Sequence, residues 1–186
     1  MHYETVLKFW FETTPKDMHF KSSPEFDAKI KDMFEIHLYN IHLFYESWLT
    51  TCDGALALII LTDQFPRNMY RGTKNAFYYD AYALDVCKYI LNLSDSKAFC
   101  FTHLDAYRKM FLILPLMHSE DFDDQVMSLK LFSIHGPKMA IPYAQNHHDV
   151  IKKFGRFPHR NEALQRKSNF EEEYFIYHNP EWPQLN

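Results

Sequence analysis

Apolar residues recur every three or four positions along most of this chain, the spacing that places side chains on one face of an α-helix. The longest such stripe consists of Phe26, Ile30, Phe34, Ile41, Phe44 and Trp48. Ser22 and Glu25 form a capping box in front of it, with Pro24 in the first turn. The pattern therefore predicts a strong amphipathic helix that begins near Pro24.

The segment Ala76–Leu93, which follows Asn75, carries two apolar stripes. One stripe consists of Phe77, Ala81, Leu84 and Leu91, and the other of Tyr78, Tyr82, Val86 and Tyr89. Because a helix with two apolar faces is covered on two sides, we expect this helix to be central.

Capping residues, glycines and prolines delimit the other predicted helices. Asp53 is expected to cap the very apolar segment Ala55–Gln64, Ser119 a helix that Gly136-Pro137 ends, and Ser168 with Glu171 the last helix. Ser94–Lys97 is expected to be a loop. The predicted helices are Tyr3–Phe11, Ala55–Gln64, Leu104–Met117 with Pro115 bending or ending it, the Ser119-capped helix to about His135, Pro142–Phe154, and one from Ser168 to about His178.

The composition agrees with an all-helical protein. The 186 residues contain only four glycines, well below the usage of about 7% that is typical of proteins and too few for the tight turns of a sandwich or barrel. A hydrophobic content of 47% supports one domain with a real core. We therefore expect a single all-α domain over residues 1–178, followed by an irregular tail at residues 179–186.

Charge and cysteine content exclude several function classes. The net charge is −4 and no basic block occurs, which argues against nucleic-acid binding. Cys52, Cys87 and Cys100 lie in apolar surroundings without a C-x-x-C pair, so we expect reduced, buried thiols. The longest uncharged apolar run, Ala55–Leu61, is too short to span a membrane. With no signal-peptide pattern at the N-terminus, these features predict a soluble, cytoplasmic protein.

Two short segments repeat a Phe-Pro pair followed by arginine and asparagine. We call them the first Phe-Pro segment, Gln64–Asn68, and the second Phe-Pro segment, Arg156–Asn161. Because proline disfavours helix in the residue before it, each pair predicts a helix end that holds the polar residues beyond it. A third polar cluster, His118–Asp121, follows another apolar run. We expect all three to gather in one polar chamber.

Long stretches of the chain resemble a known bacterial family. The stretches are LTDQFPRNMYRGTKNAFYYDAYAL, FLILPLMHSEDFDDQ and HHDVIKKFGRFPHRNEAL, and they are similar to the uncharacterised domain of unknown function 924. The resemblance implies a tetratricopeptide-like stack of antiparallel helical hairpins, and no activity. Where the family usually has Leu-Gly-Arg, this chain has Leu164-Gln165-Arg166, which disfavours a role that needs close backbone approach there.

The polar clusters supply candidate site residues. Asp63 is predicted near a helix end, where a carboxylate is unfavourable, so we expect it to pair with Arg67 or Arg71 as a structural clamp. The remaining cations define a carboxylate or phosphate pocket if the loops converge, or form a buried network with Glu120, Asp121 and Asp63. The candidate ligand-binding residues are Asp63, Gln64, Arg67, Asn68, Arg71, His118, Glu120, Gln125, His148, Arg156, His159, Arg160 and Asn161. The catalytic candidates are His118, Glu120 and His159.

Metal and cofactor sites are not predicted. His118 and Glu120 give the H-x-E pattern of zinc deaminases, but the matching C-x-x-C is absent. His147-His148-Asp149 resembles the doublet of helical phosphohydrolases, but no aspartate follows Asp149. We instead expect His148 to share a face with Ala144 and Ile151 and to act as a core histidine that hydrogen-bonds a member of the polar cluster.

Three hypotheses remain open. The first is a binding module with an Arg/His/Asn pocket for an acidic small molecule or peptide. The second is a hydrolase- or transferase-type enzyme in which His118 or His159 is the acid/base and Arg67 and Arg160 clamp an anion. The third is a buried ion network that only specifies helix packing, with function on a partner surface. The sequence selects no oligomeric state.

Overall fold

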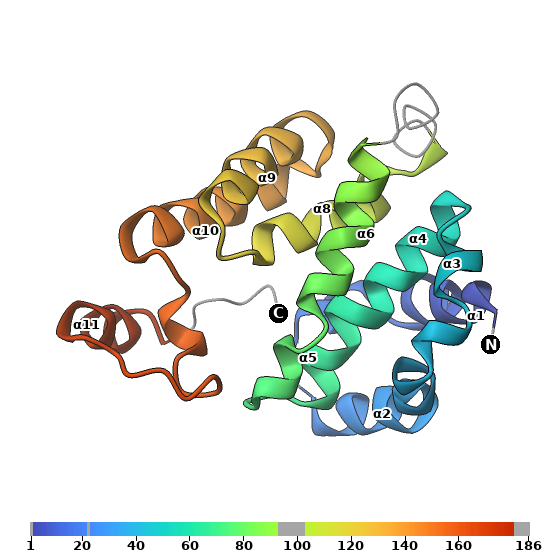
Figure 1. The fold of residues 1–186 in the computed structure, drawn as a ribbon, viewed down its shortest axis with the longest axis horizontal. Helices are drawn as coiled ribbons and strands as arrows, with labels where there is room; N and C mark the ends of the chain where they lie inside the picture. The colour runs from blue at the N-terminus through green and yellow to red at the C-terminus, as the bar shows by residue number, and fades with distance from the viewer. Residues whose placement is uncertain (1, 22, 93–102, 181–186) are drawn as a thin grey trace.

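The computed structural model describes residues 2–21, 23–92 and 103–180, and over these residues it contains helices and no strand (Figure 1). The all-α prediction is therefore confirmed. Ser22, Cys100, the predicted loop Ser94–Lys97 and the tail beyond Pro180 lie outside the described residues. No helix in the described part is long and apolar enough to cross a membrane.

One continuous buried helix forms the centre of the fold. It consists of α4 (Cys52–Ile59), a π-helical turn η4 (Ile60–Gln64) and α5 (Phe65–Met69). Every residue from Gly54 to Met69 is buried. The helices α1 (Tyr3–Leu7), α2 (Pro24–Tyr39), α6 (Asp80–Asn92) and α8 (Ala106–His118) pack around it.

The first Phe-Pro segment does not end the helix, contrary to the prediction. Pro66 lacks an N–H and would normally clash with the carbonyl four residues earlier. The π turn directly before it changes that pairing, because Phe65 N–H bonds to the carbonyl of Ile60, five residues back. The helix therefore continues through Pro66, and Asp63 lies within it rather than in its last turn.

The prediction that Ala76–Leu93 is covered on two sides was also wrong. This segment begins with a 3-10 turn η5 (Lys74–Phe77) and continues as α6. In its second apolar stripe only Val86 is buried, whereas Tyr78, Tyr82 and Tyr89 are exposed. Tyrosine tolerates such a position because its hydroxyl is hydrated while its ring stays available for packing.

Several predicted boundaries shift by one or two residues. Ser23 rather than Ser22 caps α2, Thr51 rather than Asp53 caps α4, and Asp121 rather than Ser119 caps α9 (Phe122–His135). The last capping box pairs Asn169 with Glu172 and opens α11 (Phe170–His178). The long predicted helix that starts at Pro24 breaks at Asn40, and Pro115 lies inside α8. The remaining elements are η1 (Lys8–Thr13), η2 (Lys16–Phe20), η3 (Ile41–Leu43), α3 (Tyr45–Trp48), η6 (Lys138–Ala140), α10 (Ile141–Phe154) and η7 (Pro158–Arg160).

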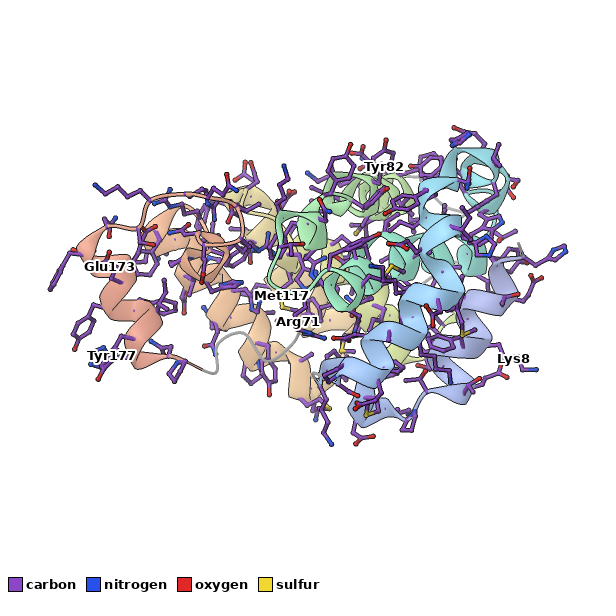
Figure 2. All side chains as sticks on the ribbon, turned by 90° about the horizontal axis from the view of Figure 1, so that it is seen from below. Lys8, Arg71, Tyr82, Met117, Glu173 and Tyr177 are labelled. Atoms are coloured by element: carbon purple, nitrogen blue, oxygen red, sulfur yellow. The ribbon has the colours of Figure 1, made fainter. Side chains whose placement is uncertain are left out.

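The C-terminal part of the chain extends from the main core. α8 packs on α9 and α9 on α10, whereas α11 lies at the far side of the molecule from α1 (Figure 1). Figure 2 shows Glu173 and Tyr177 of α11 at the opposite end from Lys8. A small apolar cluster that contains Val150, Phe157 and Phe175 joins α11 to α10. The tetratricopeptide-like stack stays a prediction.

The cysteines do not all behave as expected. Cys87 is a free and buried thiol, and burial raises its pKa above the ordinary value. Cys52, at the start of α4, takes part in a disulfide bond. The expectation of a reduced thiol at Cys52 was therefore wrong.

Candidate functional site

The two Phe-Pro segments meet at one carboxylate, Asp80, in the first turn of α6. Arg67 of the first segment donates to Asp80 through Nη1 at 2.8 Å and Nη2 at 2.9 Å. Arg160 of the second segment lies 3.5 Å from the same carboxylate through its Nη1. Residues 93 positions apart in the sequence thus share one acidic partner. We call Asp63, Arg67, Asp80, His118 and Arg160 the Asp80 cluster.

Asp63 and His118 form a buried pair at the inner end of this cluster. His118 Nδ1 lies 2.8 Å and 3.0 Å from the two carboxylate oxygens of Asp63, and Gln64 Nε2 donates to Asp63 at 2.6 Å. Burial opposes ionisation of Asp63, but the charge of Arg67 and the bonds from His118 and Gln64 lower its pKa below the usual value. Asp63 is therefore an ionised carboxylate that only accepts hydrogen bonds.

His118 is a neutral imidazole in this pair. Burial lowers its pKa, against the opposing effect of Asp63. Because the Asp63 carboxylate can only accept, the proton of neutral His118 sits on Nδ1, and Nε2 carries a lone pair. Nε2 has no hydrogen-bond partner among the described residues. The pair thus presents an unused acceptor inside the protein.

Both Nη atoms of Arg67 are engaged by groups of the chain itself, and its buried Nε has no hydrogen-bond partner among the described residues. Besides Asp80, its Nη1 lies 2.6 Å from the backbone oxygen of Asp63 and 3.0 Å from Oδ1 of that residue. Its side chain is only 2% exposed. The expected pairing of Asp63 with Arg67 is present in the structure, and together with Asp80 it neutralises the charge of Arg67.

Arg160 is held differently. Its guanidinium packs against two aromatic rings, with Cζ 4.6 Å from the ring centroid of Phe77 and 4.6 Å from that of Phe157. Its Nε has no hydrogen-bond partner among the described residues. Burial lowers its pKa to about 10, and Asp80 only partly opposes this effect. Arg160 is therefore a buried, charged and incompletely neutralised arginine.

Two further histidines lie near Arg67 and Arg160. His147 of α10 is buried, and its Nδ1 bonds to the backbone oxygen of Tyr143 at 2.8 Å. Its ring centroid lies 6.4 Å from that of His118, and burial lowers its pKa to about 3. The half-buried His159 packs 5.6 Å from Phe157, and burial, followed by the charge of Arg160, lowers its pKa to about 2. Both imidazoles are neutral at physiological pH.

The prediction for His148 was wrong by one residue. The buried face of α10 contains Ala144, His147 and Ile151, so His147 occupies the inward position. His148 instead contacts Asp149 at 2.9 Å and lies near Phe122. A helix turns by about 100° per residue, and a shift of one residue therefore moves a side chain off the core face.

Glu120 supports the second Phe-Pro segment rather than the Asp80 cluster. It accepts two hydrogen bonds from Arg166, at 2.6 Å and 2.9 Å, and one from the backbone N–H of Phe157 at 2.8 Å. Arg166 also donates to the Phe157 carbonyl at 3.0 Å and to Asn161 Oδ1 at 3.0 Å. These bonds fix Phe157, one of the two rings that stack on Arg160. Arg166 lies outside the short motif and is not among the predicted residues.

The other predicted site residues join helices elsewhere. Asn68 and Arg71 bind Asp27 of α2, at 2.8 Å and 3.0 Å. Arg156 binds Glu172 of α11 at 2.6 Å and 2.8 Å. Gln125 donates to the carbonyls of Met117 and Ser119 at the C-terminal end of α8, and Asn161 donates to Ser168. Of the predicted set, the structure brings Asp63, Gln64, Arg67, His118 and Arg160 together, with His159 beside them.

Sequence reasoning missed Asp80. It opens α6, where an acidic residue is already accounted for by the helix dipole, so its sequence context carries no further signal. The described residues contain no group of three His, Cys, Asp or Glu side chains that could hold a metal ion.

The fold and the site define an all-helical protein with a buried arginine–aspartate–histidine cluster at which the two Phe-Pro segments meet. The chain belongs to the family described as bacterial protein of unknown function, DUF924, whose family model matches residues 6–179. A solved structure of a protein of unknown function from Agrobacterium tumefaciens is similar, with a TM-score of 0.85 and 28% identity, covering 95% of this chain and 97% of that chain. No curated protein matches. The resemblance noted in the sequence is thus confirmed.

Proposed function

We propose that this protein binds an acidic small molecule or peptide through the guanidinium of Arg160. The observation that carries the proposal is the incomplete pairing of this buried cation. A guanidinium has five N–H donors, and the only ion pair of Arg160 within the described chain is the 3.5 Å contact with Asp80. A buried charge in this state gains free energy from an additional anionic partner.

Arg67 and Arg160 compete for the same aspartate, and Arg67 has the better geometry. Arg67 contacts both oxygens of Asp80 at 2.8 Å and 2.9 Å, whereas Arg160 reaches one oxygen at 3.5 Å. Asp63 is already paired with His118 and Arg67. The acids of the cluster therefore neutralise Arg67 well and Arg160 poorly.

The stacking of Arg160 also favours recognition of a planar anion. The rings of Phe77 and Phe157 both lie within cation–π distance of the guanidinium, and a guanidinium held in this way can form two parallel bonds to a carboxylate or phosphate through its edge. Asp80, whose side chain is 22% exposed, places this end of the cluster next to solvent. His118 Nε2 is an acceptor that suits a hydroxyl or protonated carboxyl group of the same ligand.

The Asp63–His118 pair supports a second candidate, a hydrolase- or transferase-type enzyme. A carboxylate bonded to Nδ1 orients an imidazole and leaves Nε2 free to take a proton, which is the arrangement of a general base. Arg160 would then hold the anionic part of the substrate. A His118→Gln variant that binds the ligand normally but loses turnover would favour this candidate over simple binding.

The test compares arginine variants in the presence of defined anions. The probes are acetate, succinate and inorganic phosphate, and the readouts are thermal unfolding and calorimetric binding. We expect at least one probe to raise the unfolding temperature of the wild type, and Arg160→Lys to remove this effect while keeping the helical circular dichroism. Lysine keeps the charge but loses the planar, bidentate donor set.

Arg71→Ala is the matched control, because Arg71 pairs with Asp27 outside the cluster. It should respond to the probes as the wild type does. If no probe stabilises the wild type, and Arg160→Ala loses its helical signal, the cluster is a structural network and the binding proposal fails.

A further inference from the structure

A tyrosine-lined pocket, whose lining shares no residue with the Asp80 cluster, lies between α2, the η3–α3 region and the start of α6. It encloses about 360 Å³, a size within the range of small-molecule sites. Its walls include Tyr39, Tyr45, Tyr78, Tyr79 and Tyr82, with Glu46 among them. Figure 2 shows Tyr82 at the outer edge of the molecule. Two lining residues, Tyr78 and Tyr82, belong to the second apolar stripe of Ala76–Leu93, which the sequence predicted to be covered.

The tyrosine rings of the pocket are steeply inclined to one another. Tyr45 meets Tyr82 at an interplanar angle of 77°, and Tyr78 meets Tyr79 at 77°. Tyr79 and Tyr82 are inclined by 47°, with centroids 5.9 Å apart. Rings arranged in this way present several π faces and edges to one compact group instead of stacking on a flat one.

The surroundings of the pocket are acidic. Glu46 lines it, and burial together with the negative charges of Asp85 and Glu46 raises the pKa of Tyr45. Tyr39 donates to Glu35 at 3.2 Å, and Lys31, the cation beside Glu35, lies 3.7 Å from that carboxylate. His42 is the titratable nitrogen on the lining. The electrostatic potential in the pocket therefore favours a cationic ligand.

We propose that this pocket binds a small organic cation with a trimethylammonium group, of the choline class. A primary ammonium ion needs several hydrogen-bond acceptors, whereas a quaternary one needs none and is stabilised by the faces of aromatic rings. The pocket offers tyrosine rings and one lining carboxylate, which suits the quaternary ion. This inference is independent of the anion site at Arg160.

The experiment titrates choline into the full chain with ¹³C-labelled tyrosine rings and follows their NMR signals. The matched ligand control is 3,3-dimethylbutan-1-ol, which has the shape of choline without its charge. We expect choline to shift the ring signals of the pocket tyrosines, and the neutral alcohol to bind about tenfold more weakly, because cation–π attraction contributes about 0.5–2 kcal/mol.

Four variants test the proposal further. Tyr82→Leu keeps an apolar side chain but loses the π face, and it should weaken choline binding about tenfold, whereas Tyr82→Phe should bind within about twofold of the wild type. Tyr89→Leu changes an exposed tyrosine of the same helix that does not line the pocket, and it should leave binding unchanged. Arg160→Lys should also leave it unchanged.

Each opposite outcome overturns the proposal. Equal binding of the neutral alcohol would show an apolar pocket without cation recognition. Binding of a trimethyllysine peptide without binding of choline would assign the surface to a protein partner. Concentration-dependent self-association that Tyr82→Leu abolishes, without any shift by choline, would make the pocket an interface between copies of this chain.

Discussion

Removal of the Arg67 side chain is expected to destabilise the fold strongly. Arg67→Met keeps much of the apolar bulk but leaves Asp63, whose side chain is 1% exposed, without its cationic partner. Breaking a buried ion pair by removing one member costs about 3–5 kcal/mol. Asp80 adds less, because it is partly exposed and keeps its contact with Arg160. For a chain of this length, each kcal/mol lowers the unfolding temperature by about 2–4 °C, so we expect a decrease of roughly 10 °C.

Urea denaturation of the wild type and two variants measures this cost. Arg71→Met is the matched control, since Arg71 also contacts a carboxylate through two nitrogens but its side chain is 35% exposed. An exposed pair of this kind contributes about 0–1 kcal/mol. The Arg67→Met penalty should also shrink toward pH 5, because loss of Arg67 lets His118 take up a proton and neutralise Asp63.

A penalty below about 1 kcal/mol at pH 8 would refute this reasoning, because it would mean that Asp63 does not depend on Arg67. Adding Asp63→Asn to Arg67→Met provides a second check. If the uncompensated carboxylate causes the loss, the double variant should be more stable than Arg67→Met alone.

Three further outcomes follow from single contacts. His147 binds fewer protons in the folded state, where its pKa is about 3, than in the unfolded state; stability should therefore fall as the pH drops from about 6.5 toward 3, by up to about 1.4 kcal/mol per pH unit, and His147→Gln should reduce this slope in urea titrations. Glu172→Gln should weaken its paired bonds to Arg156, so that hydrogen exchange speeds up in α11 while the protection of α4 is retained. Gln165 has a φ of 55°, so Gln165→Gly should raise stability by about 0.5–1 kcal/mol in thermal unfolding.

The helical class was predictable because apolar spacing reports directly on helix faces, and the scarcity of glycine excludes most β architectures. Caps were harder to place, because neighbouring residues can serve equally well. Ser22 and Ser23 are chemically the same, and Asn169 caps as well as Ser168 does. The π turn before Pro66 was not predictable, since its longer hydrogen bonds are maintained by tertiary packing. Nor does a stripe of tyrosines such as that of α6 reveal whether it is covered.

The convergence of the two Phe-Pro segments was predictable from their repeated chemistry, but the partner that joins them was not. Asp80 lies 13 residues beyond Arg67, in a helix start where an acidic residue is ordinary. The sequence analysis placed His148 on the buried face instead of His147, because the residues that face the core depend on where α10 begins. Arg166 was missed because nothing in its local sequence separates it from a solvated surface arginine.

The two Phe-Pro segments have diverged in their physical roles. In the first segment, Phe65 packs in the aromatic core against Phe34, and Arg67 forms ion pairs with Asp63 and Asp80. In the second, Phe157 leaves the main core and stacks on Arg160. Glu120 controls that ring, because it accepts the Phe157 N–H and holds Arg166 against the Phe157 carbonyl. Glu120→Gln should therefore weaken anion binding through Phe157 and leave the Asp63–Arg67 pair intact, which an unaltered Arg67→Met penalty in that background would show.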